Sequence, residues 1–329
     1  MTVPIAAAPS RPMRWLAPVL WLILSVAIVV AVRHVAWPQV LTLLIQVNLA
    51  WVALAVAANF AILPLWAIEW RLLAPAAAPV SFKGMWDVVT ISGAVLNTVP
   101  FLAGEATAVA LLVDRAGLTR GAALSVLALD QLLVAFAKLA VIGTAALAAP
   151  LPEWLRGGVL SLATAFALLL GILMLLAHRW SSLRARLLEA QGRGRELGAR
   201  LLAWGQHLEL LRNRPRIAQA MTLALAKKAA ELGAIVGIQL AFGFVPSFSW
   251  GILILAALAI TTLLPVAPGN LGVYEATVYG VYRYVGVQSD AALGMALAQH
   301  LCFLLPPIVV GYASLTARQL SRRSPASSP

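Results

Sequence analysis

Residues 250–285 read WGILILAALAITTLLPVAPGNLGVYEATVYGVYRYV, and this stretch decides the fold. It begins as an apolar helix, reaches a run rich in proline and glycine at 265–272, and resumes as a shorter helix over 273–285. Proline lacks a backbone N–H and glycine adopts conformations that other residues avoid, so the run interrupts the helix. Lipid cannot satisfy the freed backbone groups, so a break in an apolar helix predicts a protein-lined cavity within a membrane.

A second interruption of the same kind lies earlier in the chain. The apolar stretch 85–113 is broken at Asn97-Thr98-Val99-Pro100 and at Gly104-Glu105. Its second arm, Glu105–Val113, is about 13 Å long, too short to cross a hydrocarbon core of about 30 Å. We therefore expect two re-entrant hairpins that enter from opposite faces and meet near the midplane. A spanning path for 250–285 remains an alternative, because its first arm is nearly long enough to cross.

The composition places the rest of the chain in lipid as well. Of its 329 residues, 62% are hydrophobic and only 11% are charged, and the mean hydropathy is +0.91. Soluble domains carry about 45–50% apolar and about 25% charged residues. At about 20 residues per spanning helix, the chain has room for six to eight membrane segments and no separate soluble domain.

We predict an all-α integral membrane protein with six spanning helices and the two broken hairpins. The expected spans are 15–32, 50–70, 121–149, 157–177, 217–242 and 291–315. A short amphipathic stretch at 36–48 is expected at the membrane surface, and Trp51, Trp66 and Trp70 are expected to be interfacial anchors. Tails at 1–14 and 316–329 flank a single membrane domain, 15–315.

The basic residues predict the orientation. The segment 179–216 carries nine arginines against three glutamates and accounts for half of the net charge of +12. When both termini and this segment are placed in the cytoplasm, eighteen of the 24 lysines and arginines lie inside, as the positive-inside rule requires. The expected location is the bacterial inner membrane, with both termini cytoplasmic. The basic segment lacks the interleaved aromatics of a nucleic-acid site, so we expect it to bind anionic lipid and no nucleic acid.

An internal repeat supports two opposed halves, about 50–178 and 217–315. Gly117–Leu133 aligns without gaps with Gly286–Cys302. The identical pairs are Gly117/Gly286, Ala122/Ala291, Ala123/Ala292, Leu124/Leu293 and Leu132/Leu301. Each copy follows a break and a glutamate. Opposed halves of this kind are typical of inverted-repeat transporters.

The candidate substrate path consists of the polar and irregular positions inside the predicted membrane domain. A carboxylate at this depth costs several kcal/mol unless it is paired or wet, which makes it a functional candidate. An alternative for Glu105 and Glu275 is that each only caps the half-helix that it begins. The candidate positions are Asn97, Pro100, Gly104, Glu105, Asp130, Lys138, Lys227, Pro268, Gly269, Asn270, Gly272 and Glu275.

The lysines have two open interpretations. Lys227 and Glu231 are spaced i,i+4 and could neutralise each other on one helix face. Alternatively, Lys227 and Lys228 create a cavity that attracts anionic head groups. Asp130 and Lys138, two turns apart on one helix, are each expected to find a partner across the bundle. Gln299 holds the repeat position equivalent to Asp130.

Signals for catalysis and for cofactors are missing from the sequence. No phosphate-binding glycine loop, nucleophile elbow or metal-binding HExxH motif is present. The lone cysteine, Cys302, and four scattered histidines offer no metal-ligand spacing. We therefore expect a protein that is not an enzyme, with no catalytic residues, no metal and no cofactor.

The two broken motifs resemble the lysylphosphatidylglycerol synthase transmembrane family. The resemblance rests on NTVP with Gly104-Glu105, on Asp130, on PVAPGNLGVYE at 265–275, and on Pro306 and Gly311, and it extends over about 15–315. It departs from the family at Ala108, where many members carry a basic residue, and at Gly269-Asn270, where Pro-Gly-Gly is common.

The resemblance implies that the protein moves lipid between leaflets without energy from a nucleotide. The soluble domain that gives some members their synthase activity has no counterpart in this sequence, so that activity is not expected. The Asp130-Gln131 pair is similar to the hopanoid-associated branch. Expected partners are membrane lipids (an anionic phospholipid, a polyprenyl phosphate or a hopanoid), a second copy of the chain or lipid-synthesis enzymes. A lipid-modifying enzyme and a non-transporting scaffold of a lipid or hopanoid synthesis complex are the alternative functions.

Overall fold

The computed structural model describes residues 37–75, 80–99, 103–148, 213–263 and 267–323, with a few isolated positions between 153 and 168. Within these ranges the chain is helical and contains no strand. The predicted span 15–32, most of 157–177 and nearly all of the basic segment 179–216 lie outside the described residues.

A short helix and four helices make up the first part of the described chain. The short helix has one buried residue, Val40, and exposes Leu41 and Ile45, as the surface helix predicted at 36–48 should. The elements are α2 (Trp37–Gln46), α3 (Leu49–Leu73), α4 (Phe82–Thr98), α5 (Ala103–Asp114) and α6 (Arg120–Ala148).

The second part has the same order of long, short, short and long helices. Both predicted breaks coincide with ends of helices, one between Thr98 and Ala103 and the other between Thr261 and Val273. The elements are α9 (Arg214–Ala241), α10 (Phe248–Thr261), the 3₁₀ turn η2 (Pro268–Asn270), α11 (Val273–Tyr284) and α12 (Ser289–Arg323).

Local sequence explains where these helices begin and turn. The side chains of Ser81 and Ser247 accept hydrogen bonds from the backbone N–H groups of Gly84 and Trp250 at the starts of α4 and α10. The aligned glycines Gly117 and Gly286 have φ of 68° and 91° in the turns that precede α6 and α12. Glycine adopts this left-handed conformation without the strain that a Cβ would cause.

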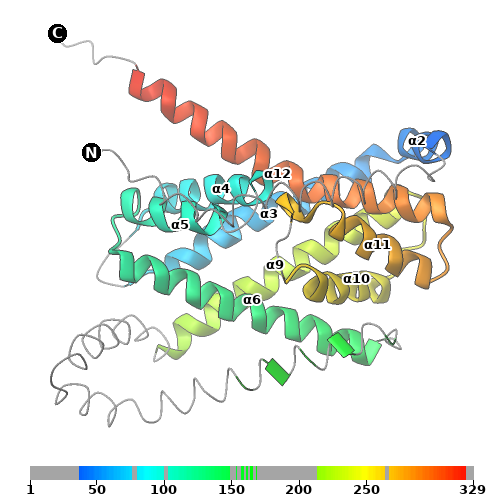
Figure 1. Cartoon of the computed structure of the whole chain (residues 1–329), viewed down its shortest axis with the longest axis horizontal. Helices are drawn as coiled ribbons and strands as arrows, with labels where there is room; N and C mark the ends of the chain where they lie inside the picture. Colours follow the sequence, from blue (N-terminus) through cyan, green and yellow to red (C-terminus); the bar gives the residue numbers. More distant parts are fainter. Residues whose placement is uncertain are drawn as a thin grey trace, which may run out of the picture.

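The two long helices α3 and α9 pack against each other in the middle of the bundle. In Figure 1, α6 and α12 run along opposite sides, with α4 and α5 toward one end and α10 and α11 toward the other. Each short helix that precedes a break packs on the final long helix of the other part, α4 on α12 and α10 on α6. The two parts are therefore interleaved and share their buried interior.

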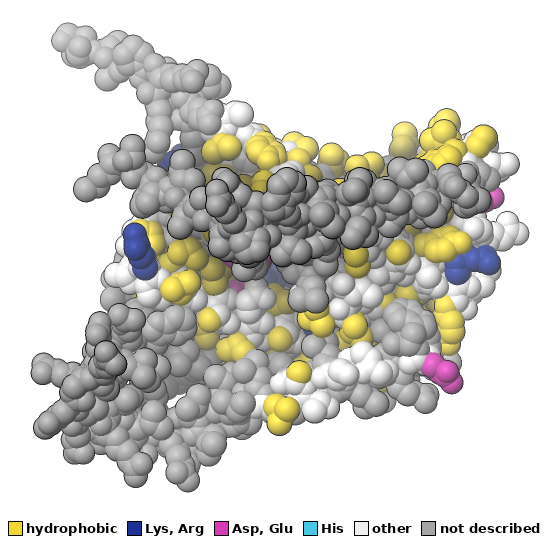
Figure 2. Space-filling view, in the orientation of Figure 1, with side chains coloured by type: hydrophobic (Ala, Val, Ile, Leu, Met, Phe, Trp, Pro, Cys, Tyr) yellow, Lys and Arg dark blue, Asp and Glu magenta, His cyan; other side chains and the backbone are white. Residues whose placement is uncertain are grey.

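Within the described part of the chain, three helices are long and apolar enough to cross a membrane, namely α3, α6 and α12. The lysine and glutamate side chains inside α9 reduce its hydropathy, and α10 is apolar but short. Figure 2 shows hydrophobic side chains over much of the visible described surface, while visible charged side chains lie mainly toward its left and right edges. This surface suits a lipid environment, because apolar side chains are stable in contact with lipid, whereas charged side chains have a high free energy there.

Candidate functional site

Three buried charged side chains meet where α3, α6 and α9 come together. The ammonium of Lys227 pairs with the carboxylate of Glu69 and lies 3.8 Å from Oδ1 of Asp130. The three side chains are 9%, 0% and 4% exposed, respectively. Lys227 Nζ also lies 5.8 Å from the ring centroid of Trp66. Burying these charges is tolerable because they partner one another.

Tryptophan side chains complete this charged cluster. Trp70 is 1% exposed and donates its indole N–H to Asp130 Oδ1 at 2.9 Å. Trp66 packs edge-on against Trp70. The predicted role of Trp70 as an interfacial anchor was therefore wrong, because its polar N–H finds a buried carboxylate instead of water. For Trp66, which is half-buried, this role stays a prediction. Trp51, at 37% exposed, is still able to serve as an anchor.

The predicted pair of Lys227 with Glu231 was also wrong. Glu231 instead accepts two hydrogen bonds from Lys228 Nζ, both at 2.7 Å. Successive side chains on a helix point about 100° apart, so Lys227 and Lys228 face different neighbours. One turns toward the acidic residues of α3 and α6, and the other toward a cavity.

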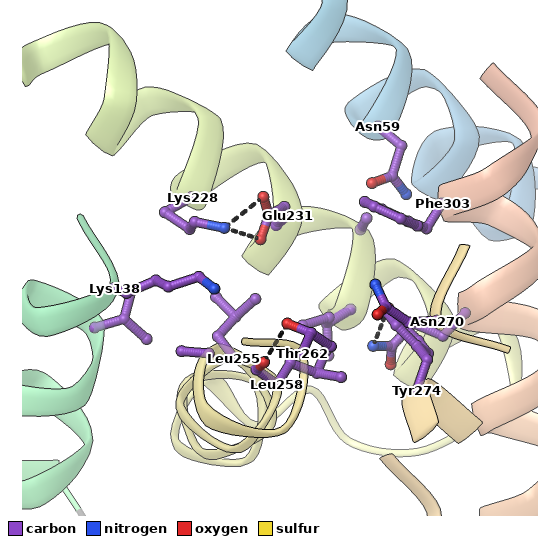
Figure 3. A pocket seen from close by; sticks show the side chains of 15 residues that line it. Asn59, Lys138, Lys228, Glu231, Leu255, Leu258, Thr262, Asn270, Tyr274 and Phe303 are labelled. Carbon is purple, nitrogen blue, oxygen red and sulfur yellow. Dashed lines mark hydrogen bonds and ion pairs between the residues drawn. The ribbon is translucent and has the colours of Figure 1, made fainter. Parts of the chain in front are cut away.

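That cavity lies beside the charged cluster and has a volume of about 120 Å³. Lys138 of α6 extends toward it from one side, while Lys228 and Glu231 of α9 lie above it in Figure 3. Asn59, Asn270, Tyr274 and Phe303 form the other side, and α10 closes the floor. Gln299 also lines the cavity and is hydrogen-bonded to Tyr274. Seven helices and turns, from α3 to α12, thus contribute side chains to one cavity.

The second break is held by an interacting glutamate and histidine. Glu275 accepts a hydrogen bond from the N–H of Gly272 at 2.7 Å, and its other oxygen lies 2.8 Å from Nδ1 of His300. His300 Nε2 lies 2.9 Å from the carbonyl oxygen of Gly269. Because a carbonyl only accepts, Nε2 must carry a proton. The imidazole also stacks on Tyr274, with ring centroids 4.2 Å apart.

Glu275 thus caps α11, as one of the two interpretations of this residue predicted. The backbone around it has the irregular geometry that the sequence suggested, with φ of 56° at Gly269, 57° at Asn270 and 84° at Gly272. Pro268 and Gly269 are both buried. Side-chain contacts from α12 hold these residues, since His300 bonds to the carbonyl of Gly269.

Two side-chain amides in the cavity wall have an oxygen without a partner. Gln299 donates from its Nε2 to the hydroxyl of Tyr274 at 2.9 Å. The remaining amide oxygen of Gln299 and the Oδ1 of Asn270 are buried and have no hydrogen-bond partner among the described residues. An unsatisfied buried acceptor costs roughly 1–3 kcal/mol, which makes both groups candidates for contact with a ligand.

The first break is held mainly by close packing. A Cβ on Gly104 would lie 2.6 Å from Cβ of Leu96, so only glycine permits this approach of α5 to α4. Glu105 lies in the first turn of α5, and its Oε2 is buried without a hydrogen-bond partner among the described residues. Glu105 does not line the cavity. Pro100 lies outside the described residues.

The two breaks contact each other, as the sequence predicted. A Cβ on Gly269 would lie 3.1 Å from the carbonyl oxygen of Asn97, at the end of α4. The amide of Asn97 donates to the carbonyl of Gly93 at 2.8 Å. Beside it, the hydroxyls of Thr98 and Tyr312 are 2.7 Å apart. The end of α4 is therefore tied to α12 and lies against η2.

The structure brings the predicted site residues into three groups. Lys227 joins Asp130 in the charged cluster, Lys138 joins Asn270 in the cavity, and Asn97 joins the second break. Asp130 found partners across the bundle, as predicted. Lys138 makes no hydrogen bond or ion pair with any residue that the structure describes.

Sequence reasoning missed Glu69 and His300. Both are ionisable residues inside predicted spans, the kind of position that is a functional candidate by default, so this signal could have identified them. Among the described residues no group of three or more histidine, cysteine or acidic side chains could hold a metal ion.

A family model described as "Lysylphosphatidylglycerol synthase TM region" matches residues 16–311. The match covers most of the chain, so the chain belongs to this family and is a membrane protein linked to lipid metabolism. No curated protein matches it. The family predicted from the two broken motifs is confirmed, while the hopanoid-associated branch remains a prediction.

Proposed function

We propose, with membership of the lysylphosphatidylglycerol synthase transmembrane family as the premise, that this chain moves a lipid between the two leaflets of a membrane. The observation that carries the proposal is a cavity that is lined in part by charged and amide side chains and enclosed by apolar helices. A lysine, an ion pair and several amides at membrane depth are costly. In the proposed function, these polar groups replace water around a lipid head group while the acyl chains stay in the bilayer.

The proposed architecture is an inverted repeat with two re-entrant hairpins. The order of long and short helices is the same in α3–α6 and α9–α12, and each part packs its first short helix on the last helix of the other. The helices α5 and α11 have 12 residues each, about 18 Å of length, which is too short to span. Six spanning helices would include 15–32 and 157–177.

The proposed location is the bacterial inner membrane, with both termini in the cytoplasm. The support is the excess of lysine and arginine in the tails and in 179–216. Labelling of single cysteines placed at 5, 200 and 325 in a Cys302→Ser background would test this orientation. Protection of all three positions from an impermeant reagent in intact cells is expected. Labelling of these positions before the cells are opened would contradict it.

The decisive experiment measures leaflet exchange of a fluorescent phosphatidylglycerol. Purified protein is reconstituted into liposomes, and an impermeant quencher reports how much label reaches the outer leaflet. We expect faster exchange with the protein than in protein-free vesicles. The exchange should fall in Glu275→Gln, which loses the carboxylate between α11 and α12, and remain in Glu153→Gln, a matched change at an exposed glutamate.

The two rival functions predict different results. A lipid-modifying enzyme would convert a donor lipid, which chromatography of the extracted lipids would detect. A scaffold for lipid-synthesis enzymes would support their activity in cells even when Glu105→Gln and Glu275→Gln are introduced. We propose transport over both because, within the described residues, the polar space offers charged and hydrogen-bonding groups but no activated nucleophile or cluster for a metal. A second copy of the chain or lipid-synthesis enzymes are the proposed protein partners.

A further inference from the structure

The cavity wall carries, among the described residues, one positive charge without a counter-ion. Its charged residues are Lys138, Lys228 and Glu231. The ammonium of Lys228 donates to both carboxylate oxygens of Glu231, so this pair is neutral. Lys138 has no hydrogen bond or ion pair with the described part of the chain and extends toward the cavity. One negative charge on a ligand would therefore neutralise the cavity wall.

The neighbouring charges do not allow a second negative charge. The cluster of Lys227, Glu69 and Asp130 carries one positive and two negative groups. Asp130 precedes Lys138 on α6 by about 12 Å of helix, so its field weakens the positive potential in the cavity. A ligand with two negative charges would leave one of them without a partner in a medium of low dielectric constant, which is strongly unfavourable.

The opposite wall of the cavity offers hydrogen-bond acceptors that have no donor within the described part of the chain. The amide oxygens of Asn270 and Gln299 are buried without partners among the described residues, and both residues line the cavity. A hydroxyl or an ammonium group on the ligand would satisfy them. The cavity volume of about 120 Å³ is close to that of a cavity that holds benzene, about 150 Å³. It therefore has room for part of a head group and not for a whole acyl chain.

We propose that this cavity binds a lipid head group built on a phosphodiester with a single negative charge, whose alcohol carries hydrogen-bond donors. Lys138 holds the phosphate, and Asn270 and Gln299 accept from the hydroxyl or ammonium groups. Phosphatidylglycerol and phosphatidylethanolamine have this chemistry. A phosphomonoester carries too much negative charge, and phosphatidylcholine has no N–H or O–H donor. This inference rests on the proposed function and names its substrate class.

The test compares four lipids that differ only in their head group. Phosphatidylglycerol, phosphatidylethanolamine, phosphatidylcholine and phosphatidic acid, each labelled on an acyl chain, are followed in liposomes that contain the whole protein. We expect the first two to exchange about tenfold faster than the last two, a ratio within the range expected when a buried acceptor gains a hydrogen-bond partner instead of staying unsatisfied. Equal acceleration of all four lipids would overturn the head-group assignment and leave lipid transport intact. Acceleration of none would overturn the transport proposal itself.

Variants separate the roles of the two walls. Lys138→Gln should slow phosphatidylglycerol about tenfold, and Lys138→Arg should retain its rate, because arginine keeps the charge. Lys83→Gln, the same change at an exposed lysine, should have no effect. Asn270→Gly keeps a residue that tolerates the positive φ and should bring phosphatidylglycerol down toward the rate of phosphatidylcholine. Variants are compared only when they elute and unfold like the unmodified protein.

Three further outcomes would each contradict one part of the proposal. Phosphatidic acid that exchanges faster than phosphatidylglycerol would overturn the single-charge assignment. Rates of phosphatidylglycerol that do not change in Lys138→Gln would overturn the role of Lys138. Liposomes loaded with water-soluble glycerophosphoglycerol distinguish a lipid from a free solute that has the same head group. Its release through the protein would overturn the lipid assignment, and its retention supports it.

Discussion

The two breaks occupy corresponding places in the two halves but are held differently. At the second, Glu275 bonds to the backbone of Gly272 and to His300, which also bonds to Gly269. At the first, Glu105 has a buried oxygen without a partner among the described residues, and the close approach at Gly104 holds the turn. Side chains therefore hold the second break, whereas backbone packing holds the first. We expect the second to contribute more to stability.

The halves also place charge differently at their aligned positions. Asp130 on α6 belongs to a buried cluster with Lys227, whereas Gln299 at the corresponding place on α12 bonds to the neutral Tyr274. Asp130 therefore takes part in a charged contact between the two halves, whereas Gln299 makes a neutral contact within the second half. Removing one charged partner should be far more damaging than removing a neutral hydrogen bond.

Lys227→Met should have the largest effect. It would leave Glu69 and Asp130 buried without their cation, at a cost of about 3–5 kcal/mol of unfolding free energy. Lys228→Met, whose pair with Glu231 is about one-fifth exposed, should cost roughly 1 kcal/mol or less. Denaturant titration in detergent micelles measures both values. Equal losses would mean that the two lysines are held in the same way.

Glu275→Ala tests the difference between the breaks. It removes the carboxylate that accepts from Gly272 and bonds to His300, with an expected loss of about 2–3 kcal/mol. Glu105→Ala should change stability by about 0.5 kcal/mol or less. The comparison uses thermal unfolding of both variants in the same detergent. A larger loss at Glu105 would reverse the proposed roles of the two breaks.

Gly311→Ala tests the crossing of α12 over α4. A Cβ at Gly311 would collide with the carbonyl oxygen of Thr90 and with Ala94, and we expect a loss of about 2 kcal/mol from overpacking. Gly280→Ala is the matched control, because a Cβ there meets no atom within 4 Å. The control should gain roughly up to 1 kcal/mol from helix propensity. A neutral Gly311→Ala would show that the two helices separate easily.

Asn270→Ala should give the smallest effect of the four principal substitutions, about 1 kcal/mol. Alanine at a φ of 57° brings its Cβ too close to the carbonyl oxygen, a strain of roughly 1–2 kcal/mol. Asn270→Gly should be close to neutral for stability, since glycine accepts this conformation. Pulse proteolysis across a denaturant series would resolve the difference. Equal stability of the two variants would indicate that η2 relaxes freely.

Much of the fold was predictable from local patterns in the sequence. Apolar length predicted α3, α6 and α12, and the runs at 97–105 and 265–272 predicted where helices end. Such signals depend on residues close in sequence, because proline, glycine and apolar periodicity act within a turn or two of helix. Whether Trp70 faces the interface or the protein interior depends on contacts with a distant helix, and there the prediction failed.

The sequence by itself determined that the chain is a membrane protein, that two of its helices are interrupted, and that a glutamate follows each interruption. Only the tertiary structure decided which side chains partner one another. Lys227 found Glu69 and Asp130 on two other helices, and His300 of α12 joined Glu275 of α11. The physical reason is that a helical pattern predicts which residues lie on the same face of a helix. Which other helix packs on that face depends on contacts between segments that are far apart in the chain.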